Sequence, residues 1–292
     1  MAPPVSDYVD ANGVRLHYIR KGAGLPLLLL HGWPEYCRVW EPVIDRLDDR
    51  FDLVAPDLRG FGDSDKPERG PSATAAEQVH AADLHALLSS LGIGRFGIVA
   101  HDVGVFPAQL LADREPQRVV GLFFFDCPNP GIRDRWRAPS QLIESWHLYF
   151  NQMPWAADLL GTSRQACRLF IGHFLRHWSG RKDAFDPVLD QWVDNFLKPG
   201  NLQGGFNWYI SRHAARVRMM SGERTEIRRI TVPTCVRWGD QDPATPVAWA
   251  DRLGDFFSDL DVASFPGAGH FPHFEFPDRA ANEIGRFFGQ RG

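Results

Sequence analysis

The fold is decided by the stretch FGIVAHDVG, residues 96–104, in which an apolar run ends at one acidic residue with small residues around it. The run predicts a buried strand, and the residues after it predict a sharp turn and a helix start. Such an elbow needs small residues two positions before and after its tip, where Ala100 and Gly104 stand. Asp102 is then displayed at the tip, unless it only caps the following helix.

Apolar stretches alternate with helical patterns along the rest of the chain. The pair Asn12-Gly13 accepts the positive φ values of a two-residue turn and predicts an edge hairpin over residues 8–18. Strands alternating with helices predict an α/β fold with a mostly parallel, doubly wound sheet. Continuous apolar runs, typical of strands buried on both faces, predict strands at 25–30, 51–56, 119–125, 234–238 and 262–265, and helical spacing predicts helices at 74–91 and 277–288.

The strand pattern is interrupted between residues 130 and 229. Six of the ten tryptophans fall in this part, which predicts a helical insertion rich in aromatic packing. Aromatic residues also suit a lid over an apolar pocket. We therefore expect a first core part at 1–129, a helical cap at 130–229 and a second core part at 230–292.

Composition narrows the class of partner. The net charge is −4 and the basic residues are scattered, which excludes a nucleic-acid or anionic membrane surface and favours a small neutral molecule. The four cysteines lie far apart without metal-ligand spacing, so buried free thiols are expected rather than a zinc site or disulfides. The N-terminal residues lack a signal pattern and no apolar run could span a bilayer. We expect a soluble cytoplasmic protein, and a homodimer is compatible with this sequence.

Three side chains with complementary chemistry each follow a predicted strand, in the order Asp102, Asp242, His270. Because the carboxyl ends of parallel strands share one edge, these side chains should meet there. An ionised carboxylate displaces a leaving group from alkyl carbon and forms an ester. In the loop after the strand at 25–30, a cis Trp33-Pro34 bond would let the Trp33 amide and the Val103 amide form an oxyanion hole; the alternative is an ordinary turn with Trp33 as a wall.

The whole chain resembles the α/β-hydrolase superfamily through the motifs HGWP at 31–34, DLRGFG at 57–62, HD at 101–102, GDQDP at 239–243 and GAGH at 267–270. An elbow aspartate is similar to the epoxide hydrolase and dehalogenase branch. The resemblance implies an eight-stranded, mostly parallel sheet with an inserted cap. It also implies that Asp102 forms an alkyl ester, which water activated by His270 then hydrolyses. Asp242 would orient the histidine, with Asp126 as the alternative, since some relatives place the acid there.

The leaving group separates the two activities, because an epoxide needs a proton donor and a halide does not. Asn207-Trp208-Tyr209 resembles a cap motif of epoxide hydrolases, which implies Tyr209 as donor. The segment at 145–150 resembles a bacterial subgroup in which histidine replaces a second tyrosine, which implies His147 as partner donor and Tyr149 as fallback. Either side chain could instead serve only packing. The expected substrate contacts are Trp33, His101, Trp146, Tyr149 and Trp208.

We therefore expect a cofactor-independent, metal-free epoxide hydrolase that converts an apolar epoxide to a vicinal diol. The first alternative is a haloalkane or haloacid dehalogenase using the same Asp102. Val103 and Phe106 stand where fluoroacetate dehalogenases carry arginines, and Val103 also replaces a tryptophan usual in haloalkane dehalogenases. The second alternative is a binding module that keeps the pocket without turnover.

Overall fold

Eight strands form one sheet in the order β1-β2-β4-β3-β5-β6-β7-β8. The computed structural model describes residues 4–47, 49–67, 76–223 and 228–291. β1 pairs antiparallel with β2 and β2 with β4, and every other pairing is parallel. The predicted mostly parallel α/β sheet is confirmed. Its strands are β1 (Val5–Ala11), β2 (Val14–Gly22), β3 (Leu25–Leu30), β4 (Phe51–Pro56), β5 (Phe96–His101), β6 (Val119–Phe125), β7 (Thr234–Gly239) and β8 (Leu260–Phe265).

The apolar pattern of each strand matches its place in the sheet. The central strands β4 and β5 are buried at every residue, as parallel strands covered on both faces must be. The strand predicted at 262–265 is present as β8, but it lies at the edge of the sheet and is largely exposed rather than buried on both faces. At the opposite edge, Asn12 and Gly13 join β1 to β2 with φ values of 51° and 76°, so the predicted hairpin turn is confirmed.

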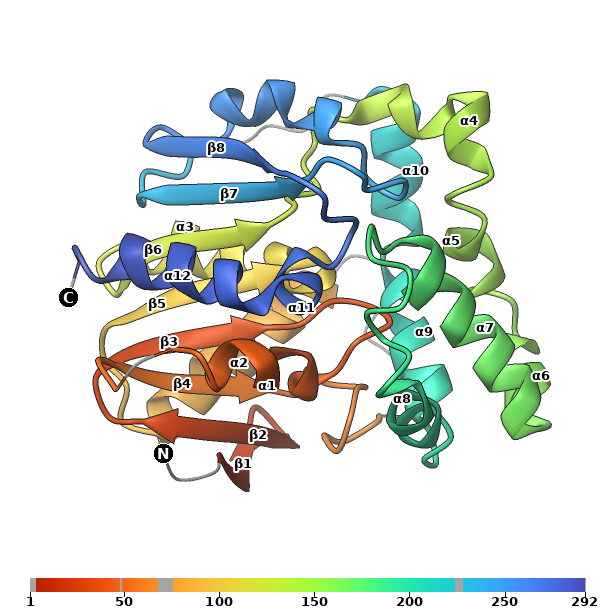
Figure 1. Ribbon diagram of the computed structural model, residues 1–292, viewed down its shortest axis with the longest axis horizontal. Coiled ribbons are helices and arrows are strands. Elements are labelled where there is room, and N and C mark those ends of the chain that lie inside the picture. The colour runs from red at the N-terminus through yellow and green to blue at the C-terminus, as the bar shows by residue number, and fades with distance from the viewer. Residues whose placement is uncertain (1–3, 48, 68–75, 224–227, 292) are drawn as a thin grey trace.

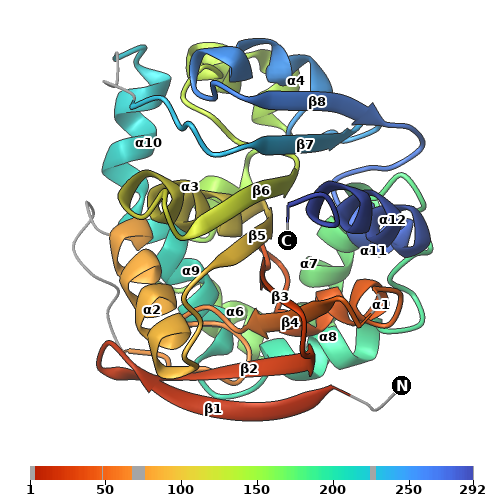
Figure 2. The same ribbon diagram turned by 90° about the vertical axis from the view of Figure 1, so that its left-hand side faces the viewer.

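Helices cover both faces of the sheet. Figure 2 shows α2 and α3 on one face and α1, α11 and α12 on the other. The helix predicted at 277–288 is α12, whose buried side chains include Ile284, Phe287 and Phe288. Of the helix predicted at 74–91, the first two residues lie outside the described part. The bounds are α1 (Glu41–Ile44), α2 (Ala76–Ser90), α3 (Val105–Arg114), α11 (Pro272–Glu275) and α12 (Pro277–Phe288).

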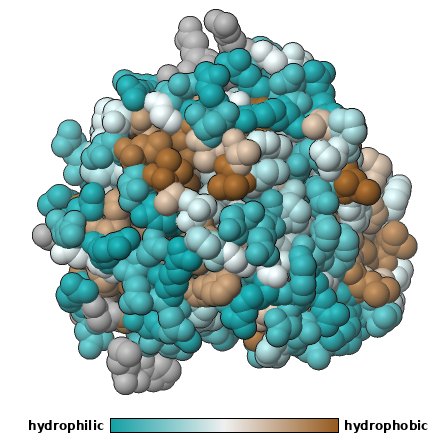
Figure 3. Space-filling model, turned by 45° about the horizontal axis from the view of Figure 1, so that its top comes forward, coloured by the Kyte–Doolittle hydropathy of each residue, from teal (hydrophilic) through white to brown (hydrophobic). Residues whose placement is uncertain are grey.

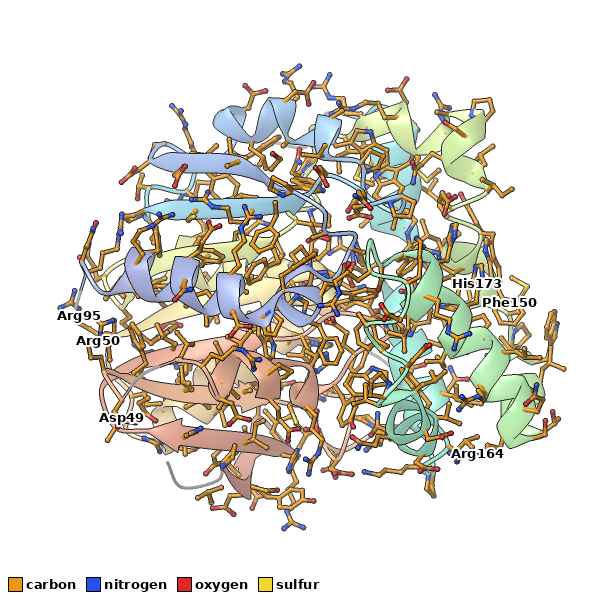
Figure 4. The ribbon with its side chains drawn as sticks, viewed as in Figure 1. Asp49, Arg50, Arg95, Phe150, Arg164 and His173 are labelled. Atoms are coloured by element: carbon orange, nitrogen blue, oxygen red, sulfur yellow. The ribbon has the colours of Figure 1, made fainter. Side chains whose placement is uncertain are left out.

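A helical insertion follows β6 and precedes β7. The arrowheads of β3 and β6 point toward its helices in Figure 1, so the insertion lies beyond the carboxyl edge of the sheet. Figure 4 labels Phe150, Arg164 and His173 at this end of the molecule, away from Asp49 and Arg95 at the other. The helices of the insertion are α4 (Pro139–Leu142), α5 (His147–Phe150), α6 (Ala156–Gly161), α7 (Arg164–His177), α8 (Leu189–Phe196), α9 (Asn201–Ser211) and α10 (His213–Met220).

The surface and the cysteines agree with the composition. Figure 3 shows a face that is mostly hydrophilic, with hydrophobic patches separated by polar side chains. The four cysteines are buried free thiols, as expected. Among the described residues, no helix has both the length and the apolar character needed to cross a bilayer.

Candidate active site

Asp102 stands at the tip of the turn between β5 and α3. Its φ is 46°, in the left-handed region that non-glycine residues seldom adopt, and a short 3-10 helix, Asp102–Gly104, follows at once. A Cβ on Gly104 would lie 2.7 Å from the Leu30 Cβ, so only glycine fits there. The Asp102 side chain is 23% exposed and lines a cavity. Its Oδ1 accepts a hydrogen bond from the Trp33 amide at 3.0 Å, and no described side chain caps α3.

His270 lies among three carboxylates, in the loop between β8 and α11. Its Nδ1 is 2.8 Å from Asp242 Oδ2, which follows β7, and 3.4 Å from Asp126 Oδ2, which follows β6. Its Nε2 is 3.9 Å from Asp102 Oδ2. The backbone N–H of His270 donates to the carbonyl oxygen of Trp178 at 2.8 Å, which fixes the histidine against the insertion.

The two candidate acids differ in their hydrogen bonds. Asp242 Oδ1 accepts from the backbone amides of Ala244 and Thr245 at 2.8 and 3.0 Å, and its Oδ2 accepts from the Thr245 hydroxyl at 2.7 Å. These bonds stabilise an ionised carboxylate. Asp126 Oδ1 accepts from the Asp102 amide at 3.2 Å, and the Thr245 hydroxyl is 3.5 Å from its Oδ2. Asp242 therefore has the geometry of an orienting acid, whereas Asp126 lies farther from His270 and accepts a hydrogen bond from the Asp102 amide.

Burial and neighbouring charges shift the pKa of Asp126 and the pKa of His270. Burial raises the pKa of Asp126 to about 7, and the Asp102 and Asp242 charges add to this rise against the opposing effect of His101 and His270. Burial by itself would lower the pKa of His270, but the charge and hydrogen bond of Asp242, with Asp126 and Asp102, raise it to about 10. The His270 ring is therefore a cation at neutral pH.

The loop after β3 holds the amide that contacts the nucleophile. The Trp33-Pro34 peptide bond is cis, as expected. The fully buried Glu35 accepts a hydrogen bond from the Gly32 amide at 2.6 Å, and two histidine nitrogens, His101 Nδ1 and His273 Nε2, lie 2.9 and 3.1 Å from its carboxylate oxygens. His101 is itself fully buried behind the nucleophile and does not line the cavity. The expectation that His101 contacts substrate is therefore wrong, because its ring is engaged below the loop.

A cavity of about 560 Å³ lies between the sheet edge and the insertion. This volume suits a small organic ligand. The sheet side contributes Asp102, Val103, Phe106, Thr245 and His270, and the insertion contributes His147, Trp178, Trp208, Tyr209 and Arg216, among others.

Trp33 supports the roof of this cavity without lining it. Its indole is stacked on the His147 ring, with centroids 5.5 Å apart and an interplanar angle of 2°. It also meets the Tyr209 ring edge-on at 5.5 Å. The same residue therefore bonds Asp102 through its backbone and packs the two expected proton donors through its side chain, but it is not placed to touch substrate.

Tyr209 and His147 are both buried, with opposite consequences. Burial raises the pKa of the Tyr209 phenol well above its usual value, so the hydroxyl keeps its proton. Burial lowers the pKa of His147 to about 3, so the ring is neutral. His147 Nδ1 lies 3.2 Å from the Glu144 carbonyl oxygen, which only accepts, so Nδ1 carries the proton and Nε2 is left as an acceptor. His147 in this tautomer accepts a hydrogen bond and does not donate one, which corrects its expected role.

Two other expected substrate contacts lie outside the cavity. Trp146 is 38% exposed, and Tyr149 is 43% exposed with its hydroxyl donating to Met220 Sδ at 3.6 Å. On the short helix α5, the cavity instead meets His147 and Leu148. Trp146 and Tyr149 are thus not placed to touch substrate, because their turn of the chain directs them to the outer side. Trp208 does line the cavity.

Sequence reasoning missed the four arginines of the cavity wall, which are Arg212, Arg216, Arg218 and Arg228. Arg212 joins α9 to α10, and Arg216 lies on α10. They follow Tyr209 by three and seven residues, the spacing that places side chains on one face of a helix. That spacing was the available signal.

Within the part of the chain that the structure describes, three buried clusters have the spacing of metal ligands. The carboxylate of each cluster already accepts a hydrogen bond from a backbone amide: Asp57 from Cys37 at 2.7 Å, Glu35 from Gly32 at 2.6 Å and Asp126 from Asp102 at 3.2 Å. The clusters are His17/Cys37/Asp57, Glu35/His101/His273 and His101/Asp126/His270.

Comparison with known proteins agrees with this architecture. The family described as alpha/beta hydrolase fold matches residues 26–277. A soluble epoxide hydrolase of Corynebacterium is 29% identical over 95% of this chain and 94% of its own length, and a fluoroacetate dehalogenase of Burkholderia is 29% identical over 96% and 92%. The solved structure of the epoxide hydrolase CorEH without ligand superposes with a TM-score of 0.82, at 27% identity over 99% of both chains. The chain therefore belongs to the α/β-hydrolase fold family.

Proposed function

We propose that this protein is an epoxide hydrolase that converts an epoxide to a vicinal diol through an ester of Asp102. The observation that carries the proposal is the meeting of a displayed carboxylate and a protonated phenol in one cavity, with His270 Nε2 at 3.9 Å from the carboxylate. The similarity to the Corynebacterium epoxide hydrolase and to CorEH supports the same activity.

In the first step the free Oδ2 of Asp102 attacks one epoxide carbon. The bond from that carbon to the epoxide oxygen breaks, and the oxygen takes the proton of the Tyr209 hydroxyl. The raised pKa of Tyr209 keeps this proton in place until the alkoxide forms. His147 Nε2, as an acceptor, orients the phenol or a water beside it.

In the second step His270 activates water. Esterification removes the charge of Asp102, which is one of the charges that raise the pKa of His270, so the histidine loses its proton more readily in the ester. This proton restores the Tyr209 hydroxyl, which gave up its own proton in the first step. His270 Nε2 then takes a proton from water, whose oxygen attacks the carbonyl carbon of the ester. Asp242 Oδ2 accepts a hydrogen bond from the His270 Nδ1–H at 2.8 Å and so keeps the ring oriented.

The Trp33 amide holds the oxygen that becomes negative in this step. It already donates to Asp102 Oδ1 at 3.0 Å. The Val103 amide, next in the chain, would be the second donor of the oxyanion hole. Collapse of the tetrahedral species breaks the bond between the ester carbon and the alkyl oxygen, and that oxygen takes the proton left on the attacking hydroxyl. The diol is released, Asp102 is again a carboxylate, and His270 keeps the proton that it took from water.

The helical insertion would act as the cap of this site. It supplies Tyr209, His147 and Trp178 to the cavity, and roofing by aromatic side chains excludes bulk water. The domain bounds 130–229, the cytoplasmic location and the homodimer remain predictions. No step of the proposed reaction requires a cofactor or a metal ion.

A dehalogenase that uses the same Asp102 is the second candidate, favoured by the similarity to the fluoroacetate dehalogenase. A halide leaves without a proton, so such an enzyme would not depend on the Tyr209 hydroxyl. Chloride or bromide release from a haloalkane, without turnover of styrene oxide, would favour this candidate.

The test is a single turnover of styrene oxide in heavy-oxygen water, followed by mass analysis of the diol and of the Asp102 peptide. The diol should contain no heavy oxygen and the peptide should gain it. In His270→Gln the ester should accumulate, as a mass increase equal to that of the substrate. Direct entry of heavy oxygen into the diol, or normal turnover by His270→Gln, would refute the two-step mechanism.

A further inference from the structure

Two arginine side chains face the cavity beside the proton donor. Arg212 and Arg216 line the same cavity as Asp102 and Tyr209. Tyr209 lies on α9, Arg212 stands at the junction between α9 and α10, and Arg216 lies on α10, where its backbone N–H donates to the Arg212 carbonyl oxygen at 2.9 Å. The proposed ring-opening phenol and two guanidinium groups thus form one row on the cap side of the cavity.

Arg212 already has partners. Its Nη1 lies 3.1 Å from Glu77 Oε2, and its guanidinium carbon lies 3.8 Å from the centroid of the Phe106 ring. The side chain is 16% exposed. One carboxylate therefore offsets one of the two positive charges.

Arg216 has no such partner. No carboxylate of the described residues comes within 4.0 Å of it, and its one hydrogen bond is a long one, from Nη1 to the Tyr209 carbonyl oxygen at 3.4 Å. Burial, with the neighbouring Arg212 charge, lowers the pKa of Arg216 to about 10, so it stays charged at neutral pH. A desolvated cation without a counter-charge is costly, and an anion placed beside it would relieve that cost.

We propose that the substrate is an epoxide that also carries an anionic group, such as a carboxylate, and that Arg216, assisted by Arg212, binds this group. The inference rests on the proposed function, whose substrate class it narrows from apolar epoxides to acidic ones. A guanidinium matches a carboxylate in shape and binds it through paired, charge-assisted hydrogen bonds. The row of side chains sets the orientation, because the anion is held by residues three and seven positions after the phenol.

Another role for these arginines makes a different prediction. The charge of Arg216 also lowers the pKa of His147, and that of Asp102 acts on Arg212. If the arginines acted only through their charge interactions with His147 and Asp102, removing them would change the activity toward neutral and anionic epoxides equally. The ratio of the two activities therefore decides the question.

The experiment compares 4-(oxiran-2-yl)benzoate with its neutral amide, 4-(oxiran-2-yl)benzamide. The measured quantity is the ratio of kcat/KM for the acid to kcat/KM for the amide. The wild type should prefer the acid by tenfold or more. Arg216→Gln should lower the ratio by about 10- to 100-fold, the effect of losing a charge-assisted hydrogen bond, and Arg216→Lys should recover part of it. Arg176→Gln, an exposed charge on α7 outside the cavity, should leave the ratio unchanged.

An equal preference of the wild type for the two compounds would overturn the inference without any variant. An unchanged ratio in folded Arg216→Gln would overturn it as well. If neither epoxide is hydrolysed, the proposed function fails, and the inference is then judged by calorimetric binding of the two product diols. Equal affinity of the acidic and neutral diols for the wild type would overturn it there, whereas preference for the acidic diol that Arg216→Gln loses would support it.

Discussion

The choice between Asp242 and Asp126 as the acid that orients His270 can be tested by replacing each with asparagine. His270 Nδ1 is 2.8 Å from the first carboxylate and 3.4 Å from the second. At an effective dielectric constant of about 20, these separations correspond to roughly 6 and 5 kcal/mol of charge attraction. The difference of about 1 kcal/mol favours Asp242 by roughly fivefold.

The protonation of Asp126 widens this gap. Because its pKa is raised to about 7, this carboxyl group carries only about half a charge near neutral pH. Asp242→Asn removes a charge-assisted hydrogen bond worth about 1.5–3 kcal/mol, so ester hydrolysis should slow by roughly 10- to 150-fold. Asp126→Asn keeps an acceptor for the Asp102 amide and should slow hydrolysis by less than about fivefold.

The pH dependence of Asp242→Asn gives a second readout. Asp126 can replace the missing acid only when it is ionised, so the residual rate should rise as the pH increases through the pKa of Asp126. The Asp242 charge contributes to the raised pKa of Asp126, so the rise in this variant should lie below pH 7. The double variant should show no such rise.

Rapid quenching with intact-protein mass analysis measures the fraction of enzyme held as the ester. The ester should accumulate in Asp242→Asn and remain a minor species in Asp126→Asn. Accumulation in Asp126→Asn with normal turnover by Asp242→Asn would refute this reasoning and assign the acid to Asp126.

Three further changes test other parts of the structure. Tyr209→Phe should slow formation of the ester from styrene oxide by about 100-fold or more in rapid-quench experiments, and an equal loss in His147→Phe would show that the histidine is a donor after all. The pKa of His80 is lowered to about 3 by burial, so its contribution to stability is complete above about pH 6.5 and is lost as the pH falls toward 3. From pH 7 to pH 5 this amounts to about 2 kcal/mol, which urea unfolding should find missing in His80→Phe; the same loss in both proteins would contradict the assignment. Gly32→Ala places a Cβ 2.6 Å from the Asp102 Cβ, so kcat/KM should fall at least tenfold while the circular dichroism spectrum stays native, and full activity would show that the loop gives way.

Features that depend on local pattern could be predicted from the residues alone. Continuous apolar runs are stable only as strands covered on both faces, so β4, β5 and β6 could be located from residues alone. The elbow at Asp102 could be located for another local reason, because its sharp turn excludes a side chain at Gly104. The elbow aspartate, the acid and the histidine could be expected to meet because the carboxyl ends of parallel strands share one edge of the sheet.

Which groups meet across the cavity depends on how distant parts of the chain pack together. Asp242 and Asp126 both follow strands of the sheet, and their distances to His270 differ by a few tenths of an ångström because of the loops around them. The carbonyl of Glu144 decided the tautomer of His147. The row that places Arg216 beside the proposed active site arises from packing of the insertion against the sheet edge. Such relations join residues far apart in the chain, and packing, rather than local pattern, sets them.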